Sequence, residues 1–448
     1  MKTIAAISTP DAAGGIAMIR ISGADAFRIA ERAFRSADGT KVTEMRGYSC
    51  AYGHVYDGET VLDDVVLTVF RAPHSYTGED TVEITCHGGI YLTKQIILLL
   101  YRCGAEPAGP GEFTRRAFEN GKLSLSQAEA VMNVIQADGA AALQLANYAK
   151  DGKLGSEMRK ISDELVDLMS ALAYWMDDAE ECPPELERTK LSQQLTVLHD
   201  KLENMAQNYQ NGLVLRSGIR TVLLGKPNAG KSSVMNWICG TDRSIVTSIA
   251  GTTRDVITEQ VKIGEYTLIL SDTAGLRDTD NEIESIGISQ AYKTLEKADL
   301  VLYVIDASAG MDDTDRETLD RCTNQNVIVI WNKNDISDDN PPVLPYPLIS
   351  VAAIHEDSVE LLADALRAHY GTLTGIHGAM PLNERQNALI CKAADALASA
   401  VEQVAFGAEL DMIYADLECA SNRLREIEGA NVSEDVIDGV FSKFCVGK

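Results

Sequence analysis

The segment Gly225–Ser232 constrains the fold of this chain more than any other, because it fits the phosphate-binding pattern G-x-x-x-x-G-K-[ST]. A short apolar run, Thr221–Leu224, precedes the segment, and Ser233–Ile238 can begin a helix after it. The motif requires this order of strand, loop and helix, because the loop amides and the helix N-terminus must point at a phosphate. The sequence therefore predicts a P-loop nucleotide-binding domain.

Within this phosphate loop, two side chains have predicted chemical roles. Lys231 is expected to neutralise charge on the β- and γ-phosphates, which makes it a catalytic candidate, and the Ser232 hydroxyl is expected to ligate Mg²⁺. The loop residues predicted to contact the nucleotide are Asn228, Ala229, Gly230, Lys231, Ser232 and Ser233.

Further signals follow in the order that a GTP-binding domain requires. Ile269–Ser271 reads as a strand leading to Asp272, a carboxylate for the metal, and then to Gly275, whose amide can meet a γ-phosphate. Later, Asn332–Asp335 matches N-K-x-D, in which the carboxylate accepts hydrogen bonds from guanine N1–H and its 2-amino group. The predicted GTP contacts here are Asp272, Thr273, Ala274, Gly275, Asn332, Lys333 and Asp335. The alternative is a degenerate domain that does not hydrolyse GTP.

The segment Val246–Asp255 has the character of a switch I loop, in which a threonine adds a hydroxyl to Mg²⁺ when γ-phosphate is present. The other interpretation is an ordinary Thr-rich loop. The residues predicted to contact GTP here are Thr247, Ser248, Ile249, Ala250, Gly251, Thr252 and Thr253.

Leu276 occupies the position at which many GTPases carry a water-orienting glutamine. An apolar side chain cannot hold a water, so another group must do this work. The spacing leaves several charged candidates open: Arg277, Asp278, Asp280, Glu282 and Glu284.

Length and composition suggest a multidomain globular protein. The 448 residues correspond to about three domains. A formal net charge of −26 argues against a broad nucleic-acid-binding or anionic-membrane surface. Nine cysteines without a C-x-x-C pair fit a reducing cytosol better than disulfides or zinc. No run reaches the roughly 18 apolar residues of a membrane span.

Hydrophobic patterning divides the chain into four segments. Residues 1–122 read as mixed α/β, with strands at Val65–Phe70 and Val82–Gly89 and an apolar helix at Tyr91–Tyr101. The segments 123–214 and 379–448 read as helical, and 215–378 is the nucleotide-binding domain inserted between them. One long helix carries apolar residues at intervals of 4, 3, 4, 3, 4 and 3, which fits a helical bundle or a coiled coil: Leu154, Met158, Ile161, Leu165, Leu168, Leu172 and Trp175.

Motifs outside the nucleotide-binding domain make the resemblance to a family specific. Together with the loops above, these motifs resemble the MnmE/TrmE family of tRNA-modification GTPases along essentially the whole chain. They are Phe70–Asp80, Cys86–Gly89, Pro110–Phe118, Asn120–Ala130 and Phe444–Lys448. The segment Ser350–Ala353 departs from the family, which usually has Ser-Ala-Lys there.

The resemblance implies a potassium ion beside the phosphates, which supplies the positive charge of an arginine finger. The matching positions are Asn228, Thr247, Ile249 and Thr252. It also implies that Thr253 joins Ser232 in binding Mg²⁺, and that Glu284 orients the attacking water when two GTP domains meet.

The resemblance also implies that residues 1–122 form a dimerising domain that binds 5,10-methylene-tetrahydrofolate or its 5-formyl analogue. The matching positions are Arg20, Glu83, Lys122 and Lys448. Chemically, a pterin favours a carboxylate partner and a glutamate tail favours cations. Cys445 is either a reactive thiol near the folate or a packing residue.

The resemblance therefore implies a cytoplasmic homodimeric GTPase that works with an FAD-dependent MnmG/GidA-type subunit in a heterotetramer. The complex would add a carboxymethylaminomethyl or aminomethyl group to C5 of the wobble uridine of certain tRNAs. Two alternatives remain open, a ribosome-assembly GTPase switch and a folate one-carbon transferase regulated by GTP.

Overall fold

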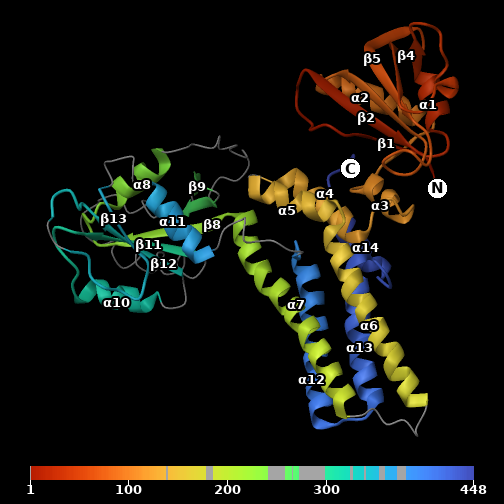
Figure 1. The fold of residues 1–448 in the computed structure, drawn as a ribbon. Coiled ribbons are helices and arrows are strands. Elements are labelled where there is room, and N and C mark those ends of the chain that lie inside the picture. The colour runs from red at the N-terminus through yellow and green to blue at the C-terminus, as the bar shows by residue number, and fades with distance from the viewer. Residues whose placement is uncertain are drawn as a thin grey trace. The chain divides into compact units, whose positions relative to one another are not determined.

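The computed structural model describes residues 2–137, 140–177, 185–240, 258–264, 266–271, 298–322, 326–337, 340–352, 359–370 and 380–448. The chain forms two compact units. One comprises Met1–Ile135, Asn147–His199 and Ala388–Lys448, and the other comprises Gln136–Ala146 and Asp200–Asn387. Mixed sheets and long helices in these units confirm the expected multidomain α/β and α class (Figure 1).

The first unit begins with a seven-stranded sheet of order β3-β4-β5-β6-β2-β1-β7. The strands are β1 Ile4–Ile7, β2 Ile16–Ser22, β3 Phe34–Ser36, β4 Ser49–Asp57, β5 Thr60–Phe70, β6 Thr81–His87 and β7 Glu106–Pro107. Neighbouring strands pair antiparallel, except that β1 and β7 are parallel. A short 3₁₀ turn, η1, spans Val42–Glu44.

Alternation along these strands gives the sheet one fully apolar face. Ile19, Leu67 and Ile84 point into a core that the helices α1 (Ala26–Ala33) and α2 (Ile90–Arg102) also enter. Helix α3 (Glu112–Glu119) contributes Phe113 to a smaller cluster with Ile4 and Ala6 of β1. Because side chains alternate between faces, the polar residues of β2 and β6 are left on the other side of the sheet.

Long helices form the rest of the first unit and run on into the second. They are α4 Leu125–Gln136, α5 Ala140–Lys150, α6 Lys153–Asp177, α7 Glu185–Ser217, α12 Glu384–Phe406, α13 Leu410–Glu428 and α14 Glu434–Phe441. Helix α7 continues to Ser217, beyond the limit expected near Leu213.

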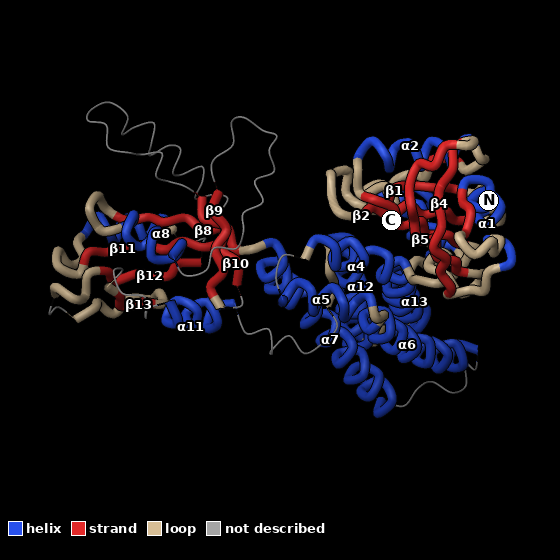
Figure 2. The backbone as a smooth tube through the Cα atoms, turned by 90° about the horizontal axis from the view of Figure 1, so that it is seen from above, coloured by secondary structure: helices blue, strands red, loops and turns tan. Residues whose placement is uncertain are grey.

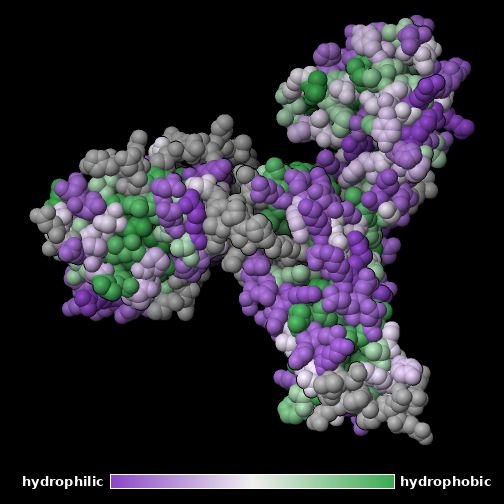
Figure 3. All heavy atoms as spheres, in the orientation of Figure 1, coloured by the Kyte–Doolittle hydropathy of each residue, from purple (hydrophilic) through white to green (hydrophobic). Residues whose placement is uncertain are grey.

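The apolar seam of α6 packs inside this unit, as the bundle interpretation predicts. Leu154, Leu165 and Leu172 are fully buried. The hydroxyls of Ser162 on α6 and Ser421 on α13 are 3.0 Å apart and buried, so the two helices lie side by side. The surface visible over these helices in Figure 3 is mostly hydrophilic, in keeping with an amphipathic bundle.

The second unit contains a six-stranded sheet of order β13-β12-β11-β8-β10-β9 (Figure 2). The strands are β8 Ile219–Gly225, β9 Thr258–Ile263, β10 Tyr266–Ser271, β11 Leu300–Asp306, β12 Asn326–Asn332 and β13 Leu348–Val351. All neighbours are parallel except β9 and β10, which form an antiparallel pair at one edge.

Helices cover both faces of this sheet, which explains why its central strands are continuous apolar runs. Helices α8 (Lys231–Gly240) and α11 (Val359–Tyr370) pack on one face, and α10 (Asp313–Arg321) packs on the other. Parallel strands place their carboxyl ends at one edge, where ligands bind in open α/β sheets. The phosphate loop follows β8 at that edge.

Two further observations concern the described part of the chain. None of the helices described is long and apolar enough to cross a membrane. Its cysteines are all free thiols.

Candidate functional site

The phosphate loop connects β8 to α8 through a backbone that only certain residues can adopt. Gly225 and Gly230 have φ angles of 142° and 93°. A Cβ atom at Gly225 would lie 2.2 Å from the Val304 carbonyl oxygen, and one at Gly230 would lie 2.2 Å from Asn332 Nδ2. Both glycines of the motif are therefore required by positive φ and by close neighbours.

Lys231 is the first residue of α8, and its side chain contacts the loop. Its Nζ donates hydrogen bonds to the carbonyl oxygens of Gly225 (2.8 Å) and Lys226 (2.7 Å). Burial lowers the pKa of Lys231. Ser232 and Ser233 follow in the first turn of α8 and are exposed. A half-buried cation beside a helix N-terminus fits an anionic phosphate.

The N-K-x-D motif lies directly against the phosphate loop. Asn332 Nδ2 donates to the Ala229 carbonyl oxygen at 3.0 Å, and Lys333 Nζ donates to the Asn228 carbonyl oxygen at 3.0 Å. Asn332 is 2% exposed. The structure thus brings together four predicted site residues that are about a hundred positions apart in the sequence.

Asp306 belongs to the same cluster but was not among the predicted site residues. Its Oδ2 atom accepts a hydrogen bond from Lys333 Nζ at 2.5 Å. Partial burial acts to raise the pKa of Asp306, but hydrogen bonds from Lys333 and Ser308 outweigh it and lower the pKa. Asp306 could have been found in the sequence from its position at the end of the apolar strand β11. That strand pairs with β12, and Asp306 is opposite Asn332.

Asp335, the predicted guanine-reading residue, lies exposed in the loop that follows β12. The end of β13 borders this loop. Asn334 Nδ2 donates to Ser350 Oγ at 3.3 Å, and the Asn334 amide donates to the Val351 carbonyl oxygen at 3.4 Å. Ser350 and Val351, the first residues of the segment expected to depart from the family pattern, therefore lie against Asn334, which precedes the predicted guanine reader.

The remaining predicted residues of the GTP and potassium sites lie outside the described part of the chain and stay predictions. They are Thr247, Ser248, Ile249, Ala250, Gly251, Thr252, Thr253, Asp272, Thr273, Ala274, Gly275 and Glu284. In the described part, no group of three His, Cys, Asp or Glu residues could hold a metal ion. The exposed Ser232 hydroxyl suits a magnesium ion that phosphate oxygens also ligate.

A second group of predicted residues meets on the polar face of the first sheet. Arg20 on β2 is opposite Glu83 on β6. The Arg20 Nε and Nη2 atoms lie 2.9 and 2.8 Å from Glu83 Oε1. The guanidinium carbon is 5.5 Å from the centre of the Tyr76 ring and 5.6 Å from that of Phe113. An ion pair between two aromatic rings offers both charge and a flat apolar wall.

The last residues of the sequence lie against the same place. The Phe113 amide donates to the Lys448 main-chain oxygen at 3.2 Å, and Ser8 Oγ donates to the Gly447 carbonyl oxygen at 3.0 Å. Cys445 is exposed, and its carbonyl oxygen accepts from the Gly111 amide at 3.3 Å. Phe113 therefore links Lys448 to Arg20.

Lys122 reaches the site through the loop that carries Tyr76. Its Nζ atom donates to the Pro73 carbonyl oxygen at 3.1 Å. A Cβ atom at Gly78 would be 3.3 Å from Lys122 Cγ, so the side chain runs along the loop. The structure thus pairs Arg20 with Glu83, places the Lys448 main chain against Phe113, and holds Lys122 on an adjoining loop.

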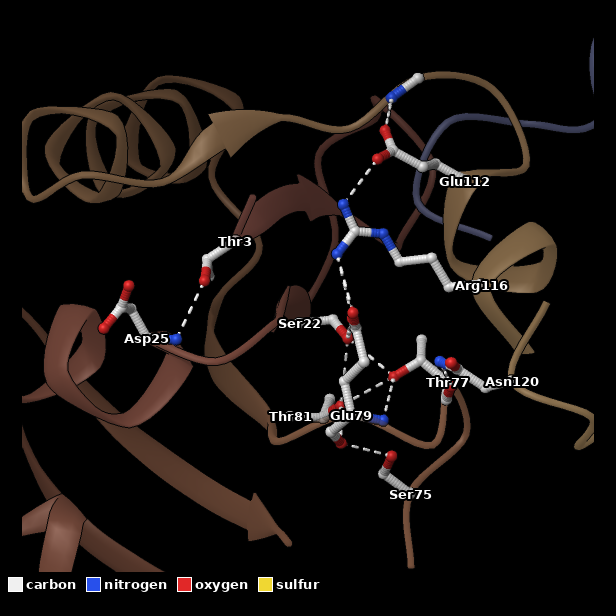
Figure 4. A network of polar contacts seen from close by, with 11 residues as sticks. Thr3, Ser22, Asp25, Ser75, Thr77, Glu79, Thr81, Glu112, Arg116 and Asn120 are labelled. Atoms are coloured by element: carbon white, nitrogen blue, oxygen red, sulfur yellow. Dashed lines mark hydrogen bonds and ion pairs between the residues drawn. The ribbon is translucent and has the colours of Figure 1, made fainter. Parts of the chain in front are cut away.

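A buried polar network fixes that loop to α3, as Figure 4 shows. Arg116, only 6% exposed, lies between two carboxylates: its Nη1 is 3.0 Å from Glu79 Oε2 and its Nη2 is 2.8 Å from Glu112 Oε1. Glu79 also accepts a hydrogen bond from Ser22 Oγ at 2.8 Å, and Asn120 Nδ2 donates to the Thr77 carbonyl oxygen at 2.7 Å. Ion pairing this far from solvent leaves the loop few alternative positions.

Two family models match the chain. The family model described as GTP-binding protein TrmE N-terminus matches residues 3–122. The model described as MnmE helical domain matches residues 125–445.

Relatives named "tRNA modification GTPase MnmE" match the chain from end to end. The protein from Clostridioides difficile (strain 630) is 36% identical over 454 residues, covering 100% of this chain and 99% of that protein. The one from Lactococcus lactis subsp. lactis (strain IL1403) is 37% identical over 450 residues, covering 100% and 98%. The one from Moorella thermoacetica (strain ATCC 39073 / JCM 9320) is 38% identical over 461 residues, covering 100% and 99%. With two family models and full-length relatives in agreement, this chain belongs to the MnmE family of tRNA modification GTPases.

Proposed function

We propose that this GTP-hydrolysing enzyme drives the modification of C5 of the wobble uridine in certain tRNAs, with carboxymethylaminomethyl or aminomethyl as the added group. The proposal that the substrate is GTP rests on the contact of Asn332 and Lys333 with the phosphate loop. That contact joins the phosphate-binding and guanine-reading motifs into one surface, which suits a guanine nucleotide. The tRNA part is supported by the family.

In this proposal two metal ions accompany GTP. Magnesium is held by Ser232 and Thr253, and potassium is held by Asn228, Thr247, Ile249 and Thr252. Potassium would offset charge that develops on the phosphates, as an arginine finger would. The apolar Leu276 cannot orient the attacking water, so another residue must do so. Glu284 would orient the water once two GTP domains of a homodimer meet.

The first-unit site is proposed to hold methylene-tetrahydrofolate or a 5-formyl analogue as the one-carbon source. The ion pair of Arg20 with Glu83 supports this, because a carboxylate can accept from the pterin and the cations can meet the folate carboxylates. Lys122 and Lys448 are assigned to the same ligand. Cys445 is exposed beside this site, as a reactive thiol requires.

We further propose the cytoplasm as the location and an FAD-dependent MnmG/GidA-type subunit as the partner in a heterotetramer. The net charge of −26 supports a division of labour in which that partner contributes much of the tRNA-binding surface. The proposed domains are 1–122, 123–214, 215–378 and 379–448.

The function is tested by mass analysis of tRNA nucleosides from cells that lack this chain. We expect the C5-modified wobble uridines to disappear and to return when the parent gene is restored. Restoration with Lys231→Ala should not return them, because the phosphate-binding cation is lost. Normal modification in cells lacking the chain would contradict the proposed function.

Asp335 is predicted to select guanine. Asp335→Asn should weaken GTP binding by about 10- to 100-fold, since hydrogen bonds to a charged group contribute about 1.5–3 kcal/mol. It should also gain affinity for xanthosine nucleotides, because an amide can donate where the carboxylate accepted. Titration with fluorescent nucleotides measures both. Asp320→Asn removes the same charge from an exposed position on α10 and should bind like the parent. Equal GTP affinity in Asp335→Asn would exclude this role.

Folate binding is predicted to depend on Arg20 and Lys448. Isothermal titration with 5-formyl-tetrahydrofolate should give about a tenfold loss of affinity for Arg20→Gln and for Lys448→Ala, as expected for one charge-assisted hydrogen bond each. Arg28→Gln, which changes an exposed side chain of α1, is the matched control and should bind like the parent. Unchanged affinity would remove the substituted residue from the site, and a parent that does not bind would rule out the folate assignment.

Hydrolysis is predicted to be about 10²-fold faster in potassium than in sodium at equal ionic strength, the scale of one preorganised charge-stabilising contact. Phosphate release under saturating GTP measures this ratio. Asn228→Gly should lose most of the stimulation and still bind GTP. Glycine is the suitable replacement because Asn228 has a φ of 64°, which alanine adopts poorly.

Glu284→Ala separates the water-orienting step from the potassium step. It should keep potassium-dependent dimerisation but slow hydrolysis. Turnover by the parent that does not distinguish potassium from sodium would refute the potassium mechanism.

A further inference from the structure

Lys226, the second residue of the phosphate loop, directs its side chain away from the loop and toward α10. Its Nζ atom forms an ion pair with Asp315 Oδ2 at 2.8 Å and another with Asp312. Hydrogen bonds to Asp312 and Asp315 raise the pKa of Lys226, so it remains charged. The side chain is thus occupied by protein carboxylates.

Asp315 is an unusual partner because its side chain is only 2% exposed. Its Oδ1 accepts from the Tyr303 hydroxyl at 3.0 Å, and its Oδ2 accepts from the Asp312 amide at 3.1 Å. Burial and the neighbouring Asp315 raise the pKa of Tyr303, so this hydroxyl stays a donor. A buried carboxylate is costly unless it is paired, and Lys226 is the cation that ion-pairs with it.

The carboxylates also belong to rigid elements. Asp312 and Asp315 form the capping box that begins α10. Tyr303 lies on β11, the strand beside β8, and is itself buried. The position of the Lys226 ammonium is therefore set by a strand and a helix terminus rather than by another loop.

The backbone of Lys226 completes the connection to the nucleotide site. Its carbonyl oxygen accepts the 2.7 Å hydrogen bond from Lys231 Nζ, the predicted phosphate-binding cation. One residue thus joins α10 through its side chain and Lys231 through its main chain.

We propose that Lys226 and Asp315 are positioning residues that hold the phosphate loop in its nucleotide-binding conformation before the nucleotide arrives. This inference rests on the proposed binding of GTP at this loop. Because the Lys226 ammonium is held by Asp312 and Asp315 on α10, the pair acts on the loop itself and should favour binding of GTP, the transition state and GDP equally. Loss of the pair raises the dissociation constants for GTP and GDP and leaves the rate of hydrolysis at saturating GTP unchanged. This result is expected when the lost interaction stabilised the bound ground state and transition state equally.

The test compares full-length variants of the pair in a double-mutant cycle. Lys226→Met and Asp315→Asn each remove one charge and keep the approximate volume. Each should raise the Kd for GDP about tenfold, and the double variant should be no weaker than either single variant, because the two residues act as one contact. Lys226→Arg keeps the charge and should bind nearly as the parent does.

Arg220→Met is the matched control. Arg220 is the second residue of the same strand, β8, at the end away from the phosphate loop, and it pairs with Asp299 at 3.3 Å. Its loss removes an ion pair from the same unit without touching the phosphate loop, so the Kd for GDP should stay within about twofold of the parent value.

The readouts are titration with fluorescent GDP and kcat from phosphate release at saturating GTP. A purely structural role would lower the active fraction and therefore kcat, with Kd unchanged, and that result would overturn the inference. If the Kd for GDP rises about 10²-fold in the double variant, the two single effects have multiplied. That result would also overturn the inference, since independent sites are additive in free energy. Lys226→Met leaves the buried Asp315 charge without its cation and could fail to fold for that reason. The double variant lacks both charges, so its Kd for GDP still tests the proposal. A parent that does not bind GDP would refute the proposed function instead.

Discussion

Two hydrogen bonds from the end of β12 to the phosphate loop determine how the nucleotide-binding unit is organised. Asn332 and Lys333 donate to consecutive carbonyl groups of that loop. A loop whose amides must face a phosphate needs its carbonyls turned the other way, where such donors can meet them. Gly230 is required because the Asn332 amide lies where a side chain would be. Base recognition and phosphate binding therefore depend on one packing arrangement.

In the first unit, a loop is likewise held in place by polar contacts, but these are ion pairs and not hydrogen bonds to main-chain carbonyls. Arg116 is nearly buried and meets both Glu79 and Glu112, and its neighbour Arg115 meets Asp438 of α14 at 2.6 Å. The two arginines therefore connect one short helix to the loop that precedes β6 and to α14. A site that must recognise a charged ligand is preorganised when its loops are already fixed by charges of their own.

Sequence reasoning predicted the elements with strong patterns. The α6 seam and the strand before the phosphate loop were both predicted, because a heptad or a continuous apolar run has few other interpretations. Strand β4 was missed, since Ser49, Gly53 and His54 are poor strand formers, and it exists because it pairs along β5. The start of β5 was missed because Asp63 and Asp64 interrupt its apolar pattern. Contacts such as Lys226 with Asp315 depend on where α10 packs, which local sequence does not encode.

The hydrogen bond between Ser8 and Gly447 joins residues 439 positions apart. During synthesis at about 5–20 residues per second, residue 8 therefore waits roughly 20–90 s for its partner. Over that interval the early sheet can form, but the place around Phe113 cannot be completed. A chain terminated shortly before its last residues would therefore carry a folded early sheet whose surroundings of Phe113 are still incomplete.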